Sequence, residues 1–268
     1  MHPIEQARTI LSGFGTPGTE NTFLSRISPR TLLLTTLLYI VAVLSVGKYD
    51  VPNLIPYFAY PVIVSALAGI SFARISCKTL PALPFLLLIG IWNPILNHTP
   101  LFTLGEYTVT AGWCSFAALM LRGYLAILAT VLLLYSTGLP RLSDAMRRMH
   151  IPAVITGQIL FTFRYLDVLL EEASSMGRAR RQRNFGQQQS CIRTWSALTG
   201  HLLLRTLDRA QRLHHALLAR GYNGTIPTLK SDKLHGRDYA YLLLWLGFLL
   251  LLFFTHPAEQ LGKLIQPA

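Results

Sequence analysis

Apolar residues in this chain are concentrated in five blocks instead of being spread evenly along it. A helix needs roughly 20 apolar residues to cross a hydrocarbon core of about 30 Å. A soluble fold would instead distribute its apolar residues at helix or strand periods. The five blocks cover about residues 31–46, 54–73, 80–96, 109–136 and 239–254. We therefore predict an all-α integral membrane protein with about five transmembrane helices.

Proline positions give the first three predicted spans their expected shapes. Ser28 and Pro29 are typical of a helix start, as N-cap and first helical residue. Pro61 predicts a kink in the second span. The third span contains Pro81, Pro84 and Pro94, so we expect it to be broken or tilted.

The distribution of charge predicts the orientation in the membrane. The net charge is +12, and 16 of the 24 Lys and Arg residues lie between 139 and 238, next to apolar blocks. This position is typical of a cytoplasmic loop and disfavours nucleic-acid binding. Basic residues also precede the first span and follow the second, at Arg26, Arg30, Arg74 and Lys78. The alternation predicts a cytoplasmic N-terminus and an external C-terminus.

Four regions follow from these observations. Residues 1–30 form a cytoplasmic leader, and residues 31–136 hold four transmembrane helices. Residues 137–238 form cytoplasmic amphipathic helices, predicted at about 142–149, 154–183 and 192–220. Residues 239–268 hold the final transmembrane helix and an external tail.

A motif is repeated inside the basic region, 37 residues apart, at the predicted ends of two long helices. The copies are Ala179-x-x-x-Arg183-Asn184-Phe185 and Ala216-x-x-x-Arg220-Gly221-Tyr222. Gly and Asn accept the left-handed conformation that ends a helix, and a preceding Arg offsets the helix dipole. A small Ala one turn earlier leaves room for a partner. A single copy would be ordinary helix capping, but two matched copies favour a pair of helix tips that each present a guanidinium to a carboxylate-lined groove.

The order and spacing of several segments resemble the transmembrane T component of energy-coupling-factor transporters, particularly the CbiQ-like cobalt and nickel branch. The similar segments are 23–30, 142–152, 163–165 and 169–172, together with the two Arg motifs. The resemblance covers about residues 23–254. The family has an Ala-Arg-Gly triplet at each tip, and Ala219-Arg220-Gly221 matches it fully. The first copy aligns either as Gln182-Arg183-Asn184, which we prefer, or as Ala179-Arg180-Arg181.

The resemblance implies a non-catalytic subunit in a prokaryotic cell membrane. Each Arg tip would dock on one of two cytoplasmic ATP-hydrolysing subunits, and their closure would be relayed to a separate substrate-binding membrane subunit. The chain has no GxxxxGK[ST] loop with which to bind ATP itself. The histidines lack metal-ligand spacing, so we expect neither a metal site nor a cofactor.

Two charged positions lie outside the Arg motifs. Arg122 falls within the fourth span, where a charge is costly. It has either a functional role or a structural partner such as a backbone carbonyl, and the adjacent Gly123 permits close packing. Glu171 and Glu172 are expected to pair with Arg residues of their own helix, such as Arg178.

Two other kinds of membrane protein were weighed against a coupling subunit. An enzyme acting on lipid or prenyl phosphates would need an acidic metal-binding cluster, whereas Asp144, Asp167 and Asp208 are widely separated. A secondary transporter is disfavoured by the large basic helical region and by the lack of repeated membrane halves.

Overall fold

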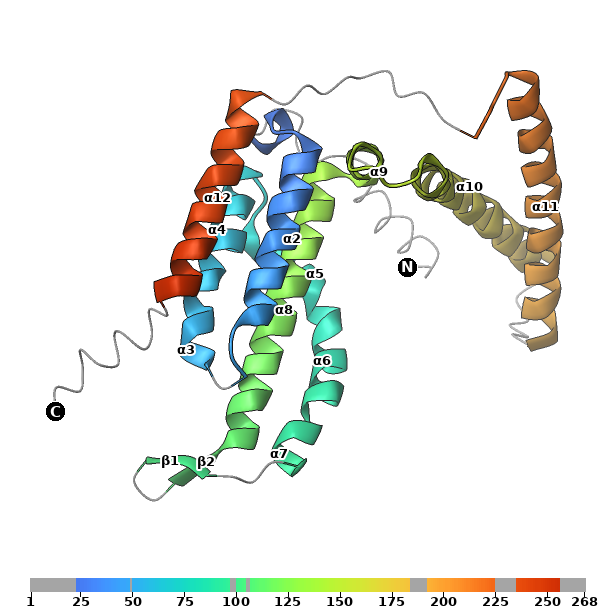
Figure 1. The fold of residues 1–268 in the computed structure, drawn as a ribbon. Coiled ribbons are helices and arrows are strands. Elements are labelled where there is room, and N and C mark those ends of the chain that lie inside the picture. Colours follow the sequence, from blue (N-terminus) through green and yellow to red (C-terminus); the bar gives the residue numbers. More distant parts are fainter. Residues whose placement is uncertain are drawn as a thin grey trace. The chain divides into compact units, whose positions relative to one another are not determined.

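A computed structural model describes residues 23–48, 50–96, 100–104, 107–183, 192–224 and 235–255. These residues belong to two compact units (Figure 1). The first unit holds the described residues of 17–138 and 232–268, and the second holds those of 139–231. The units are described separately below.

The first unit is a bundle of helices with one short hairpin. Its elements are η1 (Phe23–Arg26), α2 (Pro29–Ser45), α3 (Val51–Leu54), η2 (Ile55–Phe58), α4 (Ala59–Leu67), α5 (Phe72–Thr79), η3 (Leu80–Ala82), α6 (Leu83–Gly90), α7 (Trp92–Leu96), β1 (Pro100–Leu104), β2 (Tyr107–Thr110), α8 (Ala111–Thr137) and α12 (Gly236–Thr255). The antiparallel strands β1 and β2 connect α7 to α8.

The second unit contains three helices, all close to their predicted bounds. They are α9 (Leu139–Arg148), α10 (Ala153–Arg183) and α11 (Ile192–Ala219). His150, between α9 and α10, has a φ of 68°. This left-handed residue and Pro152 lie just after α9, which ends within one residue of the predicted end at 149.

Among the described residues, four helical segments are long and apolar enough to cross a membrane: Phe72–Ile95, Ala111–Thr137, Ala153–Arg180 and Gly236–Thr255. Three of them correspond to the predicted third, fourth and fifth spans. The first two predicted spans appear as shorter apolar helical segments, Pro29–Ser45 and Val51–Leu67. The segment Ala153–Arg180 was not predicted as a span, although its first half is almost free of charge. The chain is thus an all-α, multi-pass membrane protein.

The predicted end of the second span is wrong. Its helix ends at Leu67, because Gly69 takes a φ of 65° and breaks the run. A new helix, α5, then begins at Phe72. Arg74 and Lys78 consequently lie in α5 and not in a loop, and the Lys78 ammonium sits 3.7 Å from the centre of the Tyr135 ring on α8. The predicted break in the third span is confirmed by η3, which includes Pro81.

Aromatic and hydroxyl side chains hold three helical segments of the first unit together. Tyr39 of α2 and Tyr60 of α4 are fully buried and stacked at 4.2 Å. Trp245 of α12 meets Tyr60 edge-on at 4.6 Å. The Thr36 and Tyr60 hydroxyls are 2.9 Å apart and form a hydrogen bond, so a polar group on each side of this core is satisfied.

Close approach of α6 to α8 depends on Gly123. A Cβ atom placed there would lie only 2.5 Å from Leu86 Cδ2. Gly123→Leu should therefore overpack the contact and reduce stability by about 1–3 kcal/mol, measured as a lower unfolding temperature in detergent. Leu86→Ala should restore part of the loss. Gly247→Leu on α12, where nothing lies within 4 Å of an added Cβ, is the matched control and should change little. Equal loss in both leucine variants would contradict this account of the packing.

Candidate functional site

The end of α11 is a complete helix cap. Gly221 has a φ of 77°, the left-handed conformation predicted from the sequence. Its N–H donates to the Leu218 carbonyl at 2.9 Å, and the Tyr222 N–H donates to the Leu217 carbonyl at 3.0 Å. These two bonds define a Schellman motif, which satisfies carbonyls that the helix end would leave open. The backbone that carries Arg220 is therefore firmly held.

The surface of this end is open. Ala216, Ala219, Arg220 and Gly221 are all exposed. A Cβ atom at Gly221 would meet nothing within 4 Å. The α11 tip, defined as Ala216–Tyr222, thus presents an exposed guanidinium beside small residues, as the motif predicts.

Tyr222 attaches the α11 tip to α10. Its side chain is half-buried, and its ring meets Phe161 edge-on, with 6.5 Å between ring centres and 73° between planes. The aromatic position of the motif therefore anchors the tip, a role that the sequence alone did not specify.

The first copy of the motif lies at the end of α10. The helix ends at Arg183, as predicted, and Ala179 is exposed one turn earlier. Asn184 lies outside the described residues. The assignment of Arg183 as the second tip therefore stays a prediction, as does the choice between its two alignments.

The two helices run in opposite directions within the second unit. Phe161 and Tyr222 join the start of α10 to the end of α11, and an ion pair between Glu172 and Arg205 joins their middles. As the α10 residue number rises, the α11 residue number falls. The C-terminal ends of α10 and α11 therefore lie at opposite ends of the pair (Figure 1). From Phe161 to Arg183 the helical rise is about 33 Å.

The sequence predicts that Glu172 pairs with an Arg residue of its own helix, but the structure shows a different partner. Its partner is Arg205 of α11, while Arg178 donates to the Ser174 hydroxyl at 3.2 Å. The cross-helix ion pair was not predictable from i, i+4 spacing.

Most of this chain is similar in sequence to known proteins. The family model of the cobalt transport protein CbiQ matches residues 20–233, which include both Arg motifs. The chain belongs to the CbiQ family. Cobalt transport protein CbiQ of Salmonella typhimurium is 31% identical over 176 residues, covering 59% of this chain and 78% of that protein.

Two further relatives cover different shares of the chain. Cobalt transport protein CbiQ of Rhodobacter capsulatus is 33% identical over 116 residues, 43% of this chain and 48% of that protein. The energy-coupling factor transporter transmembrane protein EcfT of Bacillus subtilis is 24% identical over 263 residues, 92% of this chain and 98% of that protein. The names are those of transport components and give no support to a lipid or prenyl phosphate enzyme.

Arg122 of this CbiQ-family chain contacts the connection that follows α2. Its Nη2 donates to the Gly47 carbonyl, and it interacts electrostatically with Asp50. Arg122 thus has the backbone partner that a structural role requires.

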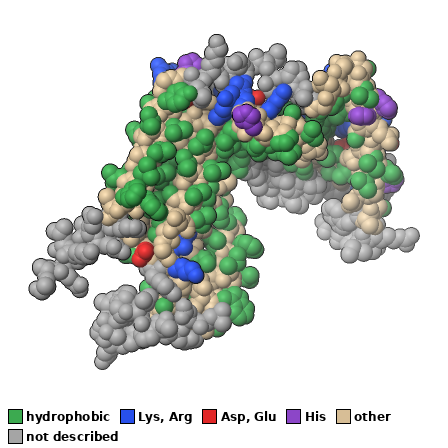
Figure 2. Space-filling view, viewed as in Figure 1, with side chains coloured by type: hydrophobic (Ala, Val, Ile, Leu, Met, Phe, Trp, Pro, Cys, Tyr) green, Lys and Arg blue, Asp and Glu red, His purple; other side chains and the backbone are tan. Residues whose placement is uncertain are grey.

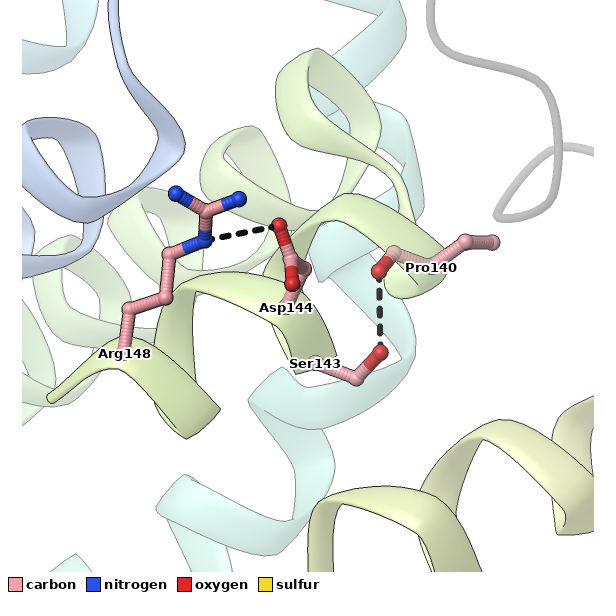
Figure 3. A network of polar contacts seen from close by, with 4 residues as sticks. All are labelled: Pro140, Ser143, Asp144 and Arg148. Carbon is pink, nitrogen blue, oxygen red and sulfur yellow. Dashed lines mark hydrogen bonds and ion pairs between the residues drawn. The ribbon is translucent and has the colours of Figure 1, made fainter. Parts of the chain in front are cut away.

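Two polar contacts within α9 were missed by the sequence reasoning. Arg148 Nε and Asp144 Oδ2 form an ion pair at 3.1 Å, and the Ser143 hydroxyl donates to the Pro140 carbonyl at 2.8 Å (Figure 3). Pro140, Ser143 and Asp144 border a cavity of about 50 Å³, which Thr156 and Gly157 of α10 also line. The i, i+4 spacing of Asp144 and Arg148 was the available signal. In the part of the chain that the structure describes, no group of three His, Cys, Asp or Glu residues could hold a metal ion.

Proposed function

We propose that this chain is the transmembrane coupling subunit of an energy-coupling-factor uptake transporter for cobalt or nickel ions. The observation that carries the proposal is the α11 tip: an exposed Arg220 on a fully capped helix end, in a chain of the CbiQ family. A guanidinium held in one direction suits a carboxylate-lined groove on a partner. The chain itself is non-catalytic and serves to transmit motion.

The partners are two cytoplasmic ATP-hydrolysing subunits and a separate substrate-binding membrane subunit. Arg220 engages one ATPase, and Arg183 engages the other. The opposite directions of α10 and α11 support this division, because two tips separated by about 33 Å of helix can each reach a different subunit. The ion pair and the Phe161–Tyr222 contact link the two helices, so movement of one tip is passed to the other helix.

The orientation that we propose is supported by the positions of the Lys and Arg residues, most of which lie at or before the start of α2, in α5 and in residues 137–238. The N-terminus and residues 137–238 lie in the cytoplasm, where the ATPases are, and the C-terminus is external. Residues 31–136 and 239–268 supply the membrane helices and the external tail.

The function is tested directly by co-purification. The affinity-tagged full chain, expressed with the ATPase subunits of its own transporter, should retain them through purification in mild detergent. Retention should be accompanied by uptake of radioactive cobalt or nickel in cells that contain the complete set of subunits. Neither retention nor uptake would be seen if the chain were a membrane enzyme.

The orientation makes a separate prediction. Single-cysteine tags after Asp50, near His98 and at Ala268 should react with a membrane-impermeant reagent added outside intact cells, whereas a tag near Gln188 should react only after the cells are opened. The reason is that most Lys and Arg residues lie at or before the start of α2, in α5 and in residues 137–238. External reaction at Gln188 would place the Arg tips away from any cytoplasmic ATPase and would overturn the proposal.

A further inference from the structure

The helices of the first unit have unequal lengths. Helix α8 has 27 residues and is about 40 Å long, whereas α2 has 17 residues and is about 25 Å long. Arg122 of α8 donates to the carbonyl of Gly47, two residues after the end of α2. The level of Arg122 therefore marks the end of α2, and residues 111–121 of α8 continue for roughly 16 Å beyond it.

This continuation of α8 is apolar and is covered on one side by α6 and α7. Gly90 of α6 lies against it, since an added Cβ atom would be 2.9 Å from both Met120 Cε and Phe116 Cδ2. Large apolar side chains on this part of the unit remain exposed: Leu88, Ile91, Trp92, Ile95 and Trp113. Such a surface is suited to hydrocarbon and not to water.

Charged side chains interrupt the apolar surface at the base of the continuation (Figure 2). Lys48 is exposed, and Asp50 and Arg122 are half-buried. The Nε of Arg122 is buried and has no hydrogen-bond partner within the described residues. A flat bilayer that covered the continuation would place these charges roughly 16 Å inside it. Burying charges at this depth is costly. Tilting the unit would not avoid the cost, because it moves the charges and the continuation of α8 together.

We propose that the headgroup layer of the bilayer dips on the α2 side of α8, and that the phosphate of a lipid headgroup binds there at Lys48, which follows the Gly47 that Arg122 contacts. Among the described residues at this level, the two cations Lys48 and Arg122 outnumber the carboxylate of Asp50, so the site attracts an anion. The adjacent face of α2 exposes Leu37, Val41 and Leu44, which makes a lipid the neighbouring occupant. On the α6 side the hydrocarbon keeps its full thickness, so the two sides of the unit face a bilayer of different depth. The inference needs only that the first unit spans a membrane, and it is independent of the transported ion.

A matched pair of positions can test this difference in depth. Leu44 lies in the last turn of α2, three residues before Gly47. Phe85 precedes Leu86, which lies against Gly123. Both positions are thus at nearly the same level of α8, and the helices that carry them, α2 and α6, lie on different sides of α8 (Figure 1). Their side chains are 58% and 67% exposed, so each accepts a label.

The experiment uses the full chain with Cys77, Cys114 and Cys191 changed to Ser, and with either Leu44→Cys or Phe85→Cys. Each variant carries an environment-sensitive fluorophore and is reconstituted in phosphatidylcholine vesicles. The vesicles contain lipids with a nitroxide quencher on either the headgroup or the middle of the acyl chain. We expect the headgroup quencher to be at least twofold more effective than the mid-chain quencher at Leu44, and the reverse at Phe85.

Lys48 variants then test the phosphate site. Lys48→Leu should reduce headgroup quenching at Leu44 by at least twofold, whereas Lys48→Arg should preserve it. Equal quenching ratios at Leu44 and Phe85 would show a flat bilayer and overturn the proposal. Quenching at Leu44 by aqueous iodide without headgroup quenching would show a water-filled crevice and would also overturn it. An unchanged signal in Lys48→Leu would exclude the bound phosphate.

Discussion

Changing both Arg183 and Arg220 to glutamate should abolish ATPase co-purification and ion uptake while leaving membrane insertion normal. Removing one partner of a buried charge pair costs about 2–5 kcal/mol, which weakens a complex by roughly thirtyfold or more. Two tips that bind two linked ATPases act together, so the loss of one is partly masked by the other. Arg220→Glu alone should therefore reduce association clearly, and Arg183→Glu should reduce it less. The measurement is the amount of ATPase retained by the tagged chain.

A matched control separates the tip from the general basic charge. Arg212→Glu makes the same change of charge on an exposed residue of α11, eight residues before Arg220. It should leave ATPase retention close to wild type. Retention by the double variant at the wild-type level would mean that the repeated motif is only helix capping.

The backbone of the α11 tip gives an independent test without any change of charge. Gly221 has a φ of 77°, and a β-branched residue there costs about 1–2 kcal/mol. Because nothing lies within 4 Å of an added Cβ, the strain comes from the backbone alone. Gly221→Val should therefore reduce ATPase retention as Arg220→Glu does, because the changed backbone redirects the Arg220 side chain. Gly221→Asn, which tolerates the left-handed conformation, should retain most of the binding. Similar losses in both variants would argue against the conformational explanation.

Replacing Asp238 should destabilise the first unit more than any surface change. Its side chain is buried, with 3% of the residue exposed. One carboxylate oxygen accepts from the Ser28 N–H at 2.8 Å, and the other accepts from the His235 N–H at 2.8 Å. Asp238→Ala leaves two backbone donors without this acceptor, at an expected loss of about 2–4 kcal/mol. We expect less monodisperse protein in detergent and a lower unfolding temperature.

The asparagine variant and a distant control refine this expectation. Asp238→Asn keeps one accepting oxygen, but its amide group faces a second N–H donor, so the loss should be intermediate. Asp208→Ala removes an exposed carboxylate from α11 and should not alter the unfolding temperature. An Asp238→Ala variant with the same unfolding temperature as the wild type would show that the carboxylate adds no stability.

Long apolar runs made α8 and α12 predictable from the sequence to within a few residues. The motif around Gly221 was also predictable, because its residue types impose a particular backbone conformation. The second span was harder, since Gly69 lies inside an apolar block and its left-handed conformation ends the helix there. The apolar first half of α10 was interpreted as part of an amphipathic region, because the charged second half dominated the pattern.

Contacts between distant residues were beyond the reach of the sequence. The Glu172–Arg205 ion pair depends on how α10 and α11 align. From the sequence, Asp238 was assigned to the end of a basic region. In the structure its carboxylate accepts hydrogen bonds both from the N–H of His235, just before α12, and from the N–H of Ser28, just before α2. Local spacing can indicate the contact with His235, but not one that joins residues 210 positions apart.

The bond between Ser28 and Asp238 also bears on how the protein is made. The acceptor for a buried N–H at the start of the first membrane helix is a carboxylate that is synthesised 210 residues later. Until α12 has been inserted, the Ser28 N–H lacks this carboxylate and must be solvated by water or headgroups. Completion of the first unit therefore requires α12 to reach α2 after residues 139–231, which belong to the second unit, have been synthesised.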